Sequence, residues 1–397
     1  MEVKIVKLNH SGDGMGYIDG KVVFVPKTLV GDVVEVDIVR EYKNYIEAKV
    51  LKYLEYSDER VGIRCPYYLE CGGCQLMGMD YQRQLDYKRD KVINILKRYG
   101  DLKLNPSIKE SRMQGYRNKI TIQVKDGKMG LYSLNSNDLV GIDKCLLVGD
   151  KINDLIGIIR DNLDLMRIRQ IVIREANDAL MVKFKGDIDR EILIDKLLPV
   201  VSSLYLNEEC LGGEKSIVDT LGKYKFLVSP ESFFQVNHEQ TINLYNQVKE
   251  YLDNGNGRVM DLYCGTGSIG IYVSDCCKRV DGIELNSSAV RDAFNNIKLN
   301  NLDNVFVKEG DVGKIIAAKD GYDAIIVDPP RSGLDKRTRK VLLEMKCPKV
   351  IYISCNPITL ARDLNELKEE YEVVDIALFD MFPNTYHVET VCLLLKK

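Results

Sequence analysis

The sequence predicts an α/β protein with a C-terminal doubly wound sheet, an N-terminal small β-barrel and a central α+β domain. From about residue 236 onward, apolar strands alternate with amphipathic helices, which is the βαβ pattern of a doubly wound sheet. Residues 1–56 instead form short strand-like runs between glycine turns. The stretch between them mixes both patterns. We therefore predict domains at 1–56, 57–235 and 236–397.

Length and composition set the first limits. A chain of 397 residues suggests two or three domains, and 45% hydrophobic with 29% charged residues is typical of a globular protein. No apolar run approaches the length of a membrane span, and no secretory signal follows Met1. We expect a cytoplasmic monomer with no membrane partner. The net charge of −3 gives no hint of nucleic acid.

The N-terminal region shows five strand candidates. They are Val3–Leu8, Met15–Ile18, Lys21–Val25, Val33–Val39 and Glu47–Tyr53, with turns at residues 11–14, 19–20 and 31–32. Five short strands with such turns favour a small closed barrel, a frequent oligonucleotide-binding shape. A structural cap without a binding role is the alternative, and the pattern alone does not decide between them.

The central region begins with a predicted helix over residues 80–99, which Gly100 ends. Strands follow at Lys119–Val124 and at Gln170–Arg174 with Ala179–Phe184, the last two joined around Asn177-Asp178. Basic residues gather between 103 and 128: Lys103, Lys109, Arg112, Arg117, Lys119, Lys125 and Lys128. Such a patch can bind phosphates, although charge alone fits a solvated face equally well.

The C-terminal region is expected to contain strands at 258–262, 279–283, 324–327, 350–354 and 391–395, with helices at 269–274 and 288–300. The loop Asp261-Leu-Tyr-Cys-Gly265-Thr-Gly267 follows the first strand, and glycines allow the backbone to approach a ligand closely. Glu284 ends the next strand, where a carboxylate can bind ribose hydroxyls. This pattern fits both a nicotinamide enzyme and an S-adenosylmethionine enzyme.

A proline turn later in the chain favours the second reading. Asp328-Pro-Pro-Arg331 follows the apolar strand 324–327, and prolines fix a rigid turn that holds Asp328 toward the cleft. A hydride-transfer enzyme has no need of this turn. Methyltransferases of exocyclic amines end a similar turn with an aromatic residue, so Arg331 argues against that reaction.

Two more residues suggest covalent chemistry. Cys355 follows the strand 350–354, and Glu389 precedes the last strand. Separately, they fit a buried structural cysteine and a surface carboxylate. Together, they fit methylation of C5 of a uracil: a thiolate adds to C6, C5 attacks the methyl donor, and a carboxylate then removes the C5 proton.

With these motifs, the chain closely resembles the RNA uridine-5-methyltransferase family, particularly its bacterial 23S rRNA members. The resemblance covers essentially the whole length. It is carried by Ser229-Pro-Glu-Ser-Phe-Phe-Gln235-Val-Asn237, the 261–267 loop, Asp328-Pro-Pro-Arg331, Ser354-Cys355-Asn-Pro357 and His387-Val-Glu389-Thr. It implies a Rossmann-like S-adenosylmethionine domain, a TRAM barrel that binds RNA, and a 23S rRNA loop as substrate.

The resemblance also implies roles for single residues. Cys355 is then the nucleophile and Glu389 the proton acceptor. The expected cofactor or substrate-pocket residues are Gln235, Tyr263, Gly265, Gly267, Glu284, Asp311 and Asp328.

The cysteines form the remaining cluster. Cys65, Cys71 and Cys74 are spaced to ligate one centre, but the spacing chooses neither zinc nor iron–sulfur, nor the fourth ligand. The resemblance implies Cys145 as the fourth ligand and a 4Fe–4S cluster. The alternative is that the three loop cysteines are free thiols with no bound metal. The rival functions are a tRNA uridine-5-methyltransferase, an inactive RNA-binding iron–sulfur protein and a nicotinamide oxidoreductase.

Overall fold

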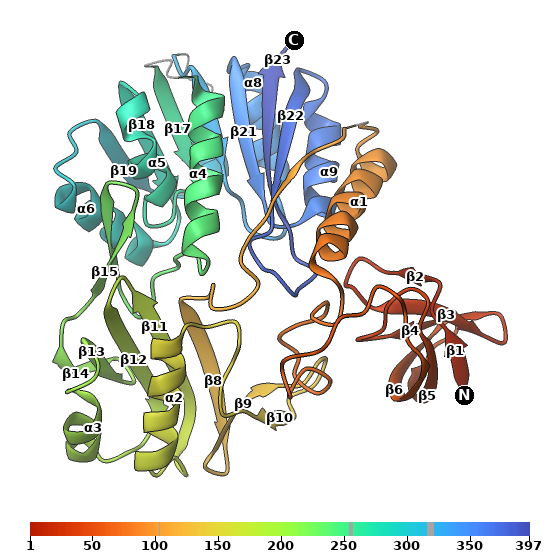
Figure 1. The fold of residues 1–397 in the computed structure, drawn as a ribbon. Helices are drawn as coiled ribbons and strands as arrows, with labels where there is room; N and C mark the ends of the chain where they lie inside the picture. The colour runs from red at the N-terminus through yellow and green to blue at the C-terminus, as the bar shows by residue number, and fades with distance from the viewer. Residues whose placement is uncertain (103, 254–256, 316–320) are drawn as a thin grey trace.

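A computed structural model describes residues 1–102, 104–253, 257–315 and 321–397 of the chain. Within these residues, three large sheets and one hairpin make up the strands. The barrel and the central sheet lie below the C-terminal sheet in Figure 1, on opposite sides of the molecule. The predicted α/β class, with a β-rich N-terminal part and a mixed centre, is confirmed. Lys103 of the predicted basic stretch lies outside the described residues.

The N-terminal barrel is closed by one bent segment. Its strands are β1 (Glu2–Lys4), β2 (Lys7–Leu8), β3 (Gly14–Ile18), β4 (Lys21–Val25), β5 (Val33–Glu41) and β6 (Tyr45–Glu55), in the order β1-β5-β6-β4-β3-β2. The sequence predicts a single strand at Val3–Leu8, but this segment pairs with β5 at one end and with β3 at the other. Between them, Ile5 N–H donates to Asp32 O and Val6 N–H to Met15 O, at 2.9 Å each. The two residues between β1 and β2 therefore close the barrel, because they connect the two edge strands of the sheet.

The central sheet has helices on only one face. Its strands are β8 (Lys119–Lys125), β9 (Lys128–Tyr132), β10 (Leu139–Gly141), β11 (Ile168–Ala176), β12 (Ala179–Gly186), β13 (Ser203–Leu206) and β14 (Glu209–Gly213), in the order β10-β9-β8-β11-β12-β13-β14. The helices are α2 (Asp150–Asn162) and α3 (Arg190–Leu197). Alternate residues such as Ile120, Ile122 and Ile173 pack with them in one core. The other face of the same strands carries polar residues such as Arg174 and Lys183 and also the buried Ala176 and Met181, which pack in a different core.

The C-terminal sheet is doubly wound with an antiparallel insertion. Its strands are β17 (Arg258–Leu262), β18 (Arg279–Glu284), β19 (Val305–Glu309), β20 (Ala324–Val327), β21 (Lys349–Ser354), β22 (Tyr371–Phe379), β23 (Glu389–Lys396) and the short β7 (Ile108–Lys109). The order is β19-β18-β17-β20-β21-β23-β22-β7. Strands β17 to β21 are parallel, and β23 runs antiparallel between β21 and β22. The sequence analysis does not predict strands β19 and β22.

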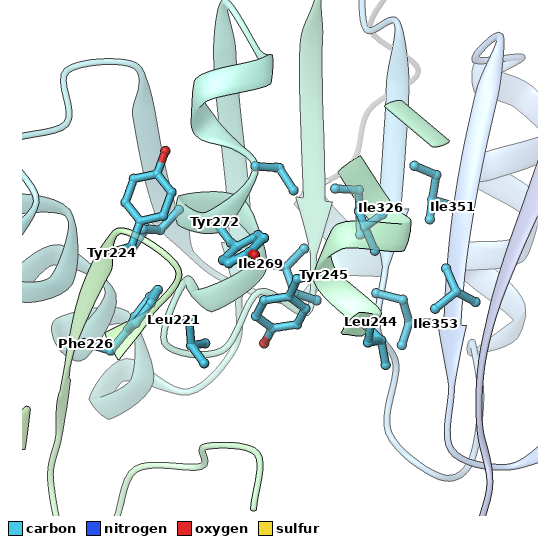
Figure 2. Close-up of a cluster of buried hydrophobic side chains, with 14 of the residues drawn as sticks. Leu221, Tyr224, Phe226, Leu244, Tyr245, Ile269, Tyr272, Ile326, Ile351 and Ile353 are labelled. Carbon is cyan, nitrogen blue, oxygen red and sulfur yellow. The ribbon is translucent and has the colours of Figure 1, made fainter. Parts of the chain in front are cut away.

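The helices of this region cover both faces of the sheet (Figure 1). They are α4 (His238–Leu252), α5 (Ser268–Tyr272) with the 3₁₀ turn Ser274–Cys276, α6 (Ser287–Leu299), α7 (Val312–Ile315), α8 (Lys336–Met345) and α9 (Pro357–Leu367). A hairpin of β15 (Ile217–Leu221) and β16 (Tyr224–Val228) adds apolar side chains from outside the sheet. Figure 2 shows its Leu221, Tyr224 and Phe226 near Tyr245 of α4 and Tyr272 of α5, in one buried cluster.

One helix of the predicted central domain lies with the C-terminal sheet instead. Helix α1 (Tyr81–Tyr99) matches the predicted helix 80–99, with Asp80 as its N-cap. Its Val92, Ile95 and Leu96 share a buried core with Leu360 of α9, and the two helices lie side by side in Figure 1. Thus α1 can place side chains against the C-terminal loops. No described helix is long and apolar enough to cross a membrane.

Candidate active site

The glycine loop after β17 adopts a conformation that its sequence permits. Gly265 and Gly267 have φ of 54° and 77°, which glycine adopts at little cost. Tyr263 has φ of 64°, an uncommon and strained conformation for a bulky residue. Its backbone turn brings the Gly265 N–H to 3.0 Å from a carboxylate oxygen of Glu284 at the end of β18. The two strand ends are therefore joined directly beside the loop.

The predicted cofactor residues on neighbouring strands come together. Tyr263, Glu284 and Asp311 follow or end β17, β18 and β19, which are adjacent in the sheet. The Tyr263 hydroxyl lies 3.2 Å from the Thr338 hydroxyl oxygen. Burial raises the pKa of Tyr263 to about 12, and Asp335 and Asp311 contribute to this value. Asp328 follows β20 on the other side of β17. These residues line the carboxyl edge of the sheet, where open α/β sheets bind ligands.

Two buried carboxyl groups give this edge an unbalanced charge. Burial and, to a smaller extent, the nearby Asp328 raise the pKa of Asp261 to about 7. Burial also raises the pKa of Asp328 to about 7. One oxygen of Asp261 accepts a hydrogen bond from Gly270 N–H, while the other has no partner among the described residues. A cationic ligand would relieve both groups, whereas an anionic pyrophosphate would be repelled. The charge therefore fits adenosylmethionine better than a nicotinamide dinucleotide.

Gln235 comes from a different part of the chain. It lies in the loop between β16 and α4, and its carbonyl accepts a hydrogen bond from the Asn118 side chain at 3.3 Å. Asn237 in the same loop donates to the carbonyl of Met381 at 3.0 Å. The loop thus joins the central sheet to the segment that precedes β23.

Cys355 and Glu389 lie at the same end of the antiparallel pair β21 and β23. Ser354 of β21 pairs with Thr390 of β23, so the next step of the register sets Cys355 opposite Glu389. Cys355 also precedes α9, whose N-cap is Asn356 and whose first turn begins with Pro357. The sequence predicts both as site residues but does not predict that they come together, because β23 turns back along β21 instead of continuing the parallel order.

The environment of this pair is apolar and acidic. Burial, with smaller contributions from Glu389 and Asp328 and an opposing one from Arg331, raises the pKa of the Cys355 thiol to about 11. Burial and Asp328 likewise raise the pKa of Glu389, which is 6% exposed, to about 8. Both groups therefore hold their protons more tightly than in water. Neither becomes charged easily until a cation enters the site.

Helix α1 fixes the segment 380–388 that leads to Glu389. Lys88 donates to the Asp380 carboxylate and, at 3.0 Å, to the carbonyl of Phe382. The side chains of both Lys88 and Asp380 are fully buried. Lys91 donates to the carbonyls of Tyr386 at 2.6 Å and His10 at 3.1 Å, so it joins the same segment to the barrel.

Sequence reasoning missed these lysines. A signal exists, since Lys88 stands three residues after Leu85 and four before Val92, on the apolar stripe of the predicted helix. A charged residue in that position indicates a buried partner.

A cleft of about 500 Å³ lies where the barrel, the cysteine loop and the 380–388 segment meet. Its lining includes Asp13, Gly73, Arg117, Arg331, Tyr386 and His387. Burial and, to a smaller extent, the nearby Arg331 lower the pKa of His387 to about 4. His387 is therefore neutral at physiological pH and can act only as a hydrogen-bonding or stacking group there.

The four predicted cluster cysteines line one cavity of about 510 Å³. Burial and, to a smaller extent, the neighbouring Cys145, Cys71 and Cys65 raise the pKa of Cys74 to about 12. Lys27 of the barrel donates to the carbonyls of Cys71, at 3.0 Å, and Cys74. Nevertheless, no group of three or more metal-binding side chains in the described part of the chain is arranged to hold a metal ion.

Three family comparisons match parts of the chain. The family described as tRNA (uracil-5-)-methyltransferase matches residues 313–397, the TRAM domain matches 1–51, and the methyltransferase small domain matches 244–346. The first match includes both Cys355 and Glu389.

Similar proteins span the whole chain. An uncharacterized RNA methyltransferase of Halalkalibacterium halodurans is 35% identical over 99% of this chain and 96% of its own length. One of Clostridium tetani is 35% identical over 98% of this chain and 95% of its own. The crystal structure of Pyrococcus abyssi tRNA (uracil-54, C5)-methyltransferase with S-adenosyl-L-homocysteine superimposes with a TM-score of 0.83, at 28% identity and with full coverage of both chains.

Proposed function

The chain belongs to the RNA uracil-5-methyltransferase family, and we propose that it methylates C5 of a uridine in a 23S rRNA loop through a covalent Cys355 adduct. As a member of this family it is an S-adenosylmethionine-dependent RNA methyltransferase, which excludes the nicotinamide alternative. The observation that carries the mechanism is the placement of Cys355 opposite Glu389, in a buried site beside Asp328.

The proposed reaction balances with these two side chains. The Cys355 thiolate forms a bond to C6 of the uracil, and the ring electrons move to C5 and O4 as an enolate. C5 then takes the methyl group, and the electron pair of the broken S–CH₃ bond stays on the departing adenosylhomocysteine. Glu389 accepts the C5 proton, the C6–S bond breaks, and the thiolate is restored. One difficult substitution thereby becomes several easier steps.

The raised pKa values fit the order of these steps. A bound sulfonium ion places a positive charge beside Asp328, Cys355 and Glu389, and a nearby cation favours the charged form of each. Cofactor binding thus favours both the thiolate and the carboxylate. We assign Tyr263, Gly265, Gly267, Asp311 and Glu284 to adenosylmethionine, with the Glu284 carboxylate on the ribose hydroxyls, and Gln235 to the pocket around the target base.

As a second part of the proposal, we infer that the four cysteines lining this cavity hold a 4Fe–4S cluster. A single ion would draw its sulfur ligands to about 2.3 Å. A four-iron cluster attaches each thiolate to a different iron and therefore needs a wider arrangement. Cys65, Cys71, Cys74 and Cys145 around one cavity fit the wider arrangement. Such a cluster would tie the 65–74 loop to the segment before α2. Anaerobically purified protein should be brown with about four irons per chain; stoichiometric zinc in colourless protein would reject the cluster.

A tRNA substrate is the second candidate. The Pyrococcus abyssi enzyme that superimposes on the entire chain, barrel included, acts on tRNA by its name. The barrel therefore does not separate rRNA from tRNA. The preference for rRNA rests on the resemblance of the barrel combined with the four-cysteine set to the 23S rRNA members of the family.

Mapping of 5-methyluridine tests the proposal directly. Total RNA from cells with and without the gene should differ at a 23S rRNA loop position, and purified protein should restore the methyl group in vitro. Loss of the modification from tRNA alone would replace the rRNA assignment. RNA that is bound but never methylated would indicate the inactive RNA-binding alternative.

A further inference from the structure

Two cations on the face of the central sheet opposite α2 form no ion pair with another residue in the described part of the chain. Lys119 of β8 and Arg174 of β11 are direct partners across the antiparallel ladder, so their side chains leave the sheet on the same face. Arg174 is only 4% exposed, and its buried Nη1 has no hydrogen-bond partner among the described residues. Two neighbouring cations that lack counter-ions destabilise the free protein. Stability of the free protein therefore does not explain why they are placed together.

The nearby acids are engaged elsewhere. Glu231 attracts Lys119 but forms its ion pair with Lys183, and Asp219 attracts Arg174 but accepts from His238 at 3.3 Å. Burial lowers the pKa of Arg174 to about 10. Burial and the positive charge of Arg174 lower the pKa of Lys119 to about 8. Burial is the main cause of both shifts, so each cation is held away from water without a paired acid among the described residues. An anion is the ligand that would complete this site.

The cation pair lies next to the loop that carries Gln235. Asn118, the neighbour of Lys119, donates its backbone N–H to Val236 O at 2.9 Å and its side chain to Gln235 O at 3.3 Å. Phe233 in the same loop is 76% exposed. Ile120 and Ile173, which adjoin the two cations in sequence, point to the opposite face and pack in the core with α2. The cations therefore face away from the helices, on the side where Glu231 of the same loop pairs with Lys183.

We propose that Lys119 and Arg174 bind a phosphodiester of the RNA next to the target uridine. This inference rests on the proposed function. A guanidinium and an ammonium on adjacent strands suit a phosphate, since arginine binds two of its oxygens at once and lysine adds a point charge. Holding the flanking phosphate would support a uridine that has left its stack. The cost in stability of the free protein is then recovered when RNA is bound.

Single substitutions with a matched control test the site. Lys119→Gln and Arg174→Gln each remove one charge, and Lys196→Gln on α3, exposed and on the helix side of the same sheet, is the control. RNA affinity is measured across salt concentrations with adenosylhomocysteine present. Each site variant should weaken RNA binding by about tenfold and lower the slope of log K against log salt by about 1. The control should change neither, and the melting temperature of the site variants should stay the same or rise.

Chemical modification of the RNA locates the phosphate. A neutral methylphosphonate is placed in turn at each linkage around the target uridine. At one flanking linkage it should weaken binding to the wild-type protein as Arg174→Gln does, and it should cause little further loss with that variant. Additive losses at every linkage would overturn the proposal, as would wild-type affinity and salt slope in Lys119→Gln. Weaker adenosylmethionine binding with unchanged RNA binding would assign the cations to the cofactor carboxylate instead. Absence of methylation by the wild-type protein would instead reject the proposed function itself.

Discussion

The two halves of the catalytic cleft are held in different ways. In the cofactor half, the bonds that shape the loop join near neighbours in sequence: Gly270 to Asp261 across nine residues and Gly265 to Glu284 across nineteen. In the half that holds Glu389, Lys88 reaches Asp380 across 292 residues and Gln84 reaches Asn384 across 300. The cofactor loop is therefore specified within one βαβ unit, whereas the Glu389 segment depends on a helix from a distant part of the chain.

This difference suggests that the two halves can be disturbed separately. Changes at α1 should affect handling of the uracil base and leave cofactor binding intact. Changes in the β17–β18 turns should have the opposite effect. The following variants test that separation, beginning with the largest expected effect.

Cys355→Ala should abolish methyl transfer, because no other described group stands where its thiol could attack C6. Adenosylmethionine affinity should remain near the wild-type value, since the thiol acts on the base alone. Single-turnover methylation and calorimetric binding measure the two quantities. Substantial turnover by this variant would reject the covalent mechanism.

Glu389→Gln should slow turnover by on the order of 10²–10⁴-fold, the usual contribution of a general base. Addition and methyl transfer need no such base, so methylated RNA bonded to Cys355 should accumulate as a slow band on a denaturing gel. The band should require both adenosylmethionine and Cys355. A variant with normal turnover would assign the proton to another group, and one without methylation or adduct would make Glu389 a residue that positions the ring.

Lys88→Met should destabilise the protein by about 3–5 kcal/mol, because it leaves the buried Asp380 carboxylate without its partner. The double variant Lys88→Met/Asp380→Leu should regain most of this loss, since no buried charge remains. Denaturant unfolding measures both. In folded Lys88→Met protein, the methylation rate should fall while adenosylmethionine affinity is retained. An equal loss of cofactor affinity would show that the two halves are not separable.

The raised pKa of Glu389 predicts a pH-dependent stability. Its folded value of about 8 lies above the value of about 4.3 expected in the unfolded chain. The folded state therefore binds the proton more tightly, and this stabilisation is lost as the pH rises through about 8. Glu389→Gln, which stays neutral, should melt like wild type near pH 4 and at a higher temperature at pH 9. If wild type and Glu389→Gln melt at the same temperature at pH 9 as well as at pH 4, the Glu389 carboxyl is not desolvated.

Glu284→Gln should give the smallest effect of the series. The amide keeps the size of the side chain but weakens both the bond from Gly265 N–H and the predicted contact with the ribose. Adenosylmethionine affinity should fall by roughly tenfold, the effect of about 1.4 kcal/mol, and RNA affinity should not change. A fall in RNA affinity of the same size would show that the two halves of the cleft cannot be disturbed separately.

Much of the cofactor half could be predicted from the sequence. The strands 258–262 and 324–327 begin and end where predicted, and Gly265, Gly267 and Glu284 lie together as expected. These features depend on apolar strands, glycine turns and short connections, all of which are visible within a few dozen residues. The barrel strands followed for the same reason, apart from the break between β1 and β2, which only closure of the sheet imposes.

The sequence by itself also determined which residues could do the chemistry, because thiolate addition and proton removal need a cysteine and a carboxylate. Only the tertiary structure decided that β23 runs antiparallel to β21, which sets Cys355 opposite Glu389. It alone also placed Lys88 against Asp380 and Lys119 beside Arg174. The physical reason is that pairings between distant segments depend on how whole sheets and helices pack, which local periodicity does not encode.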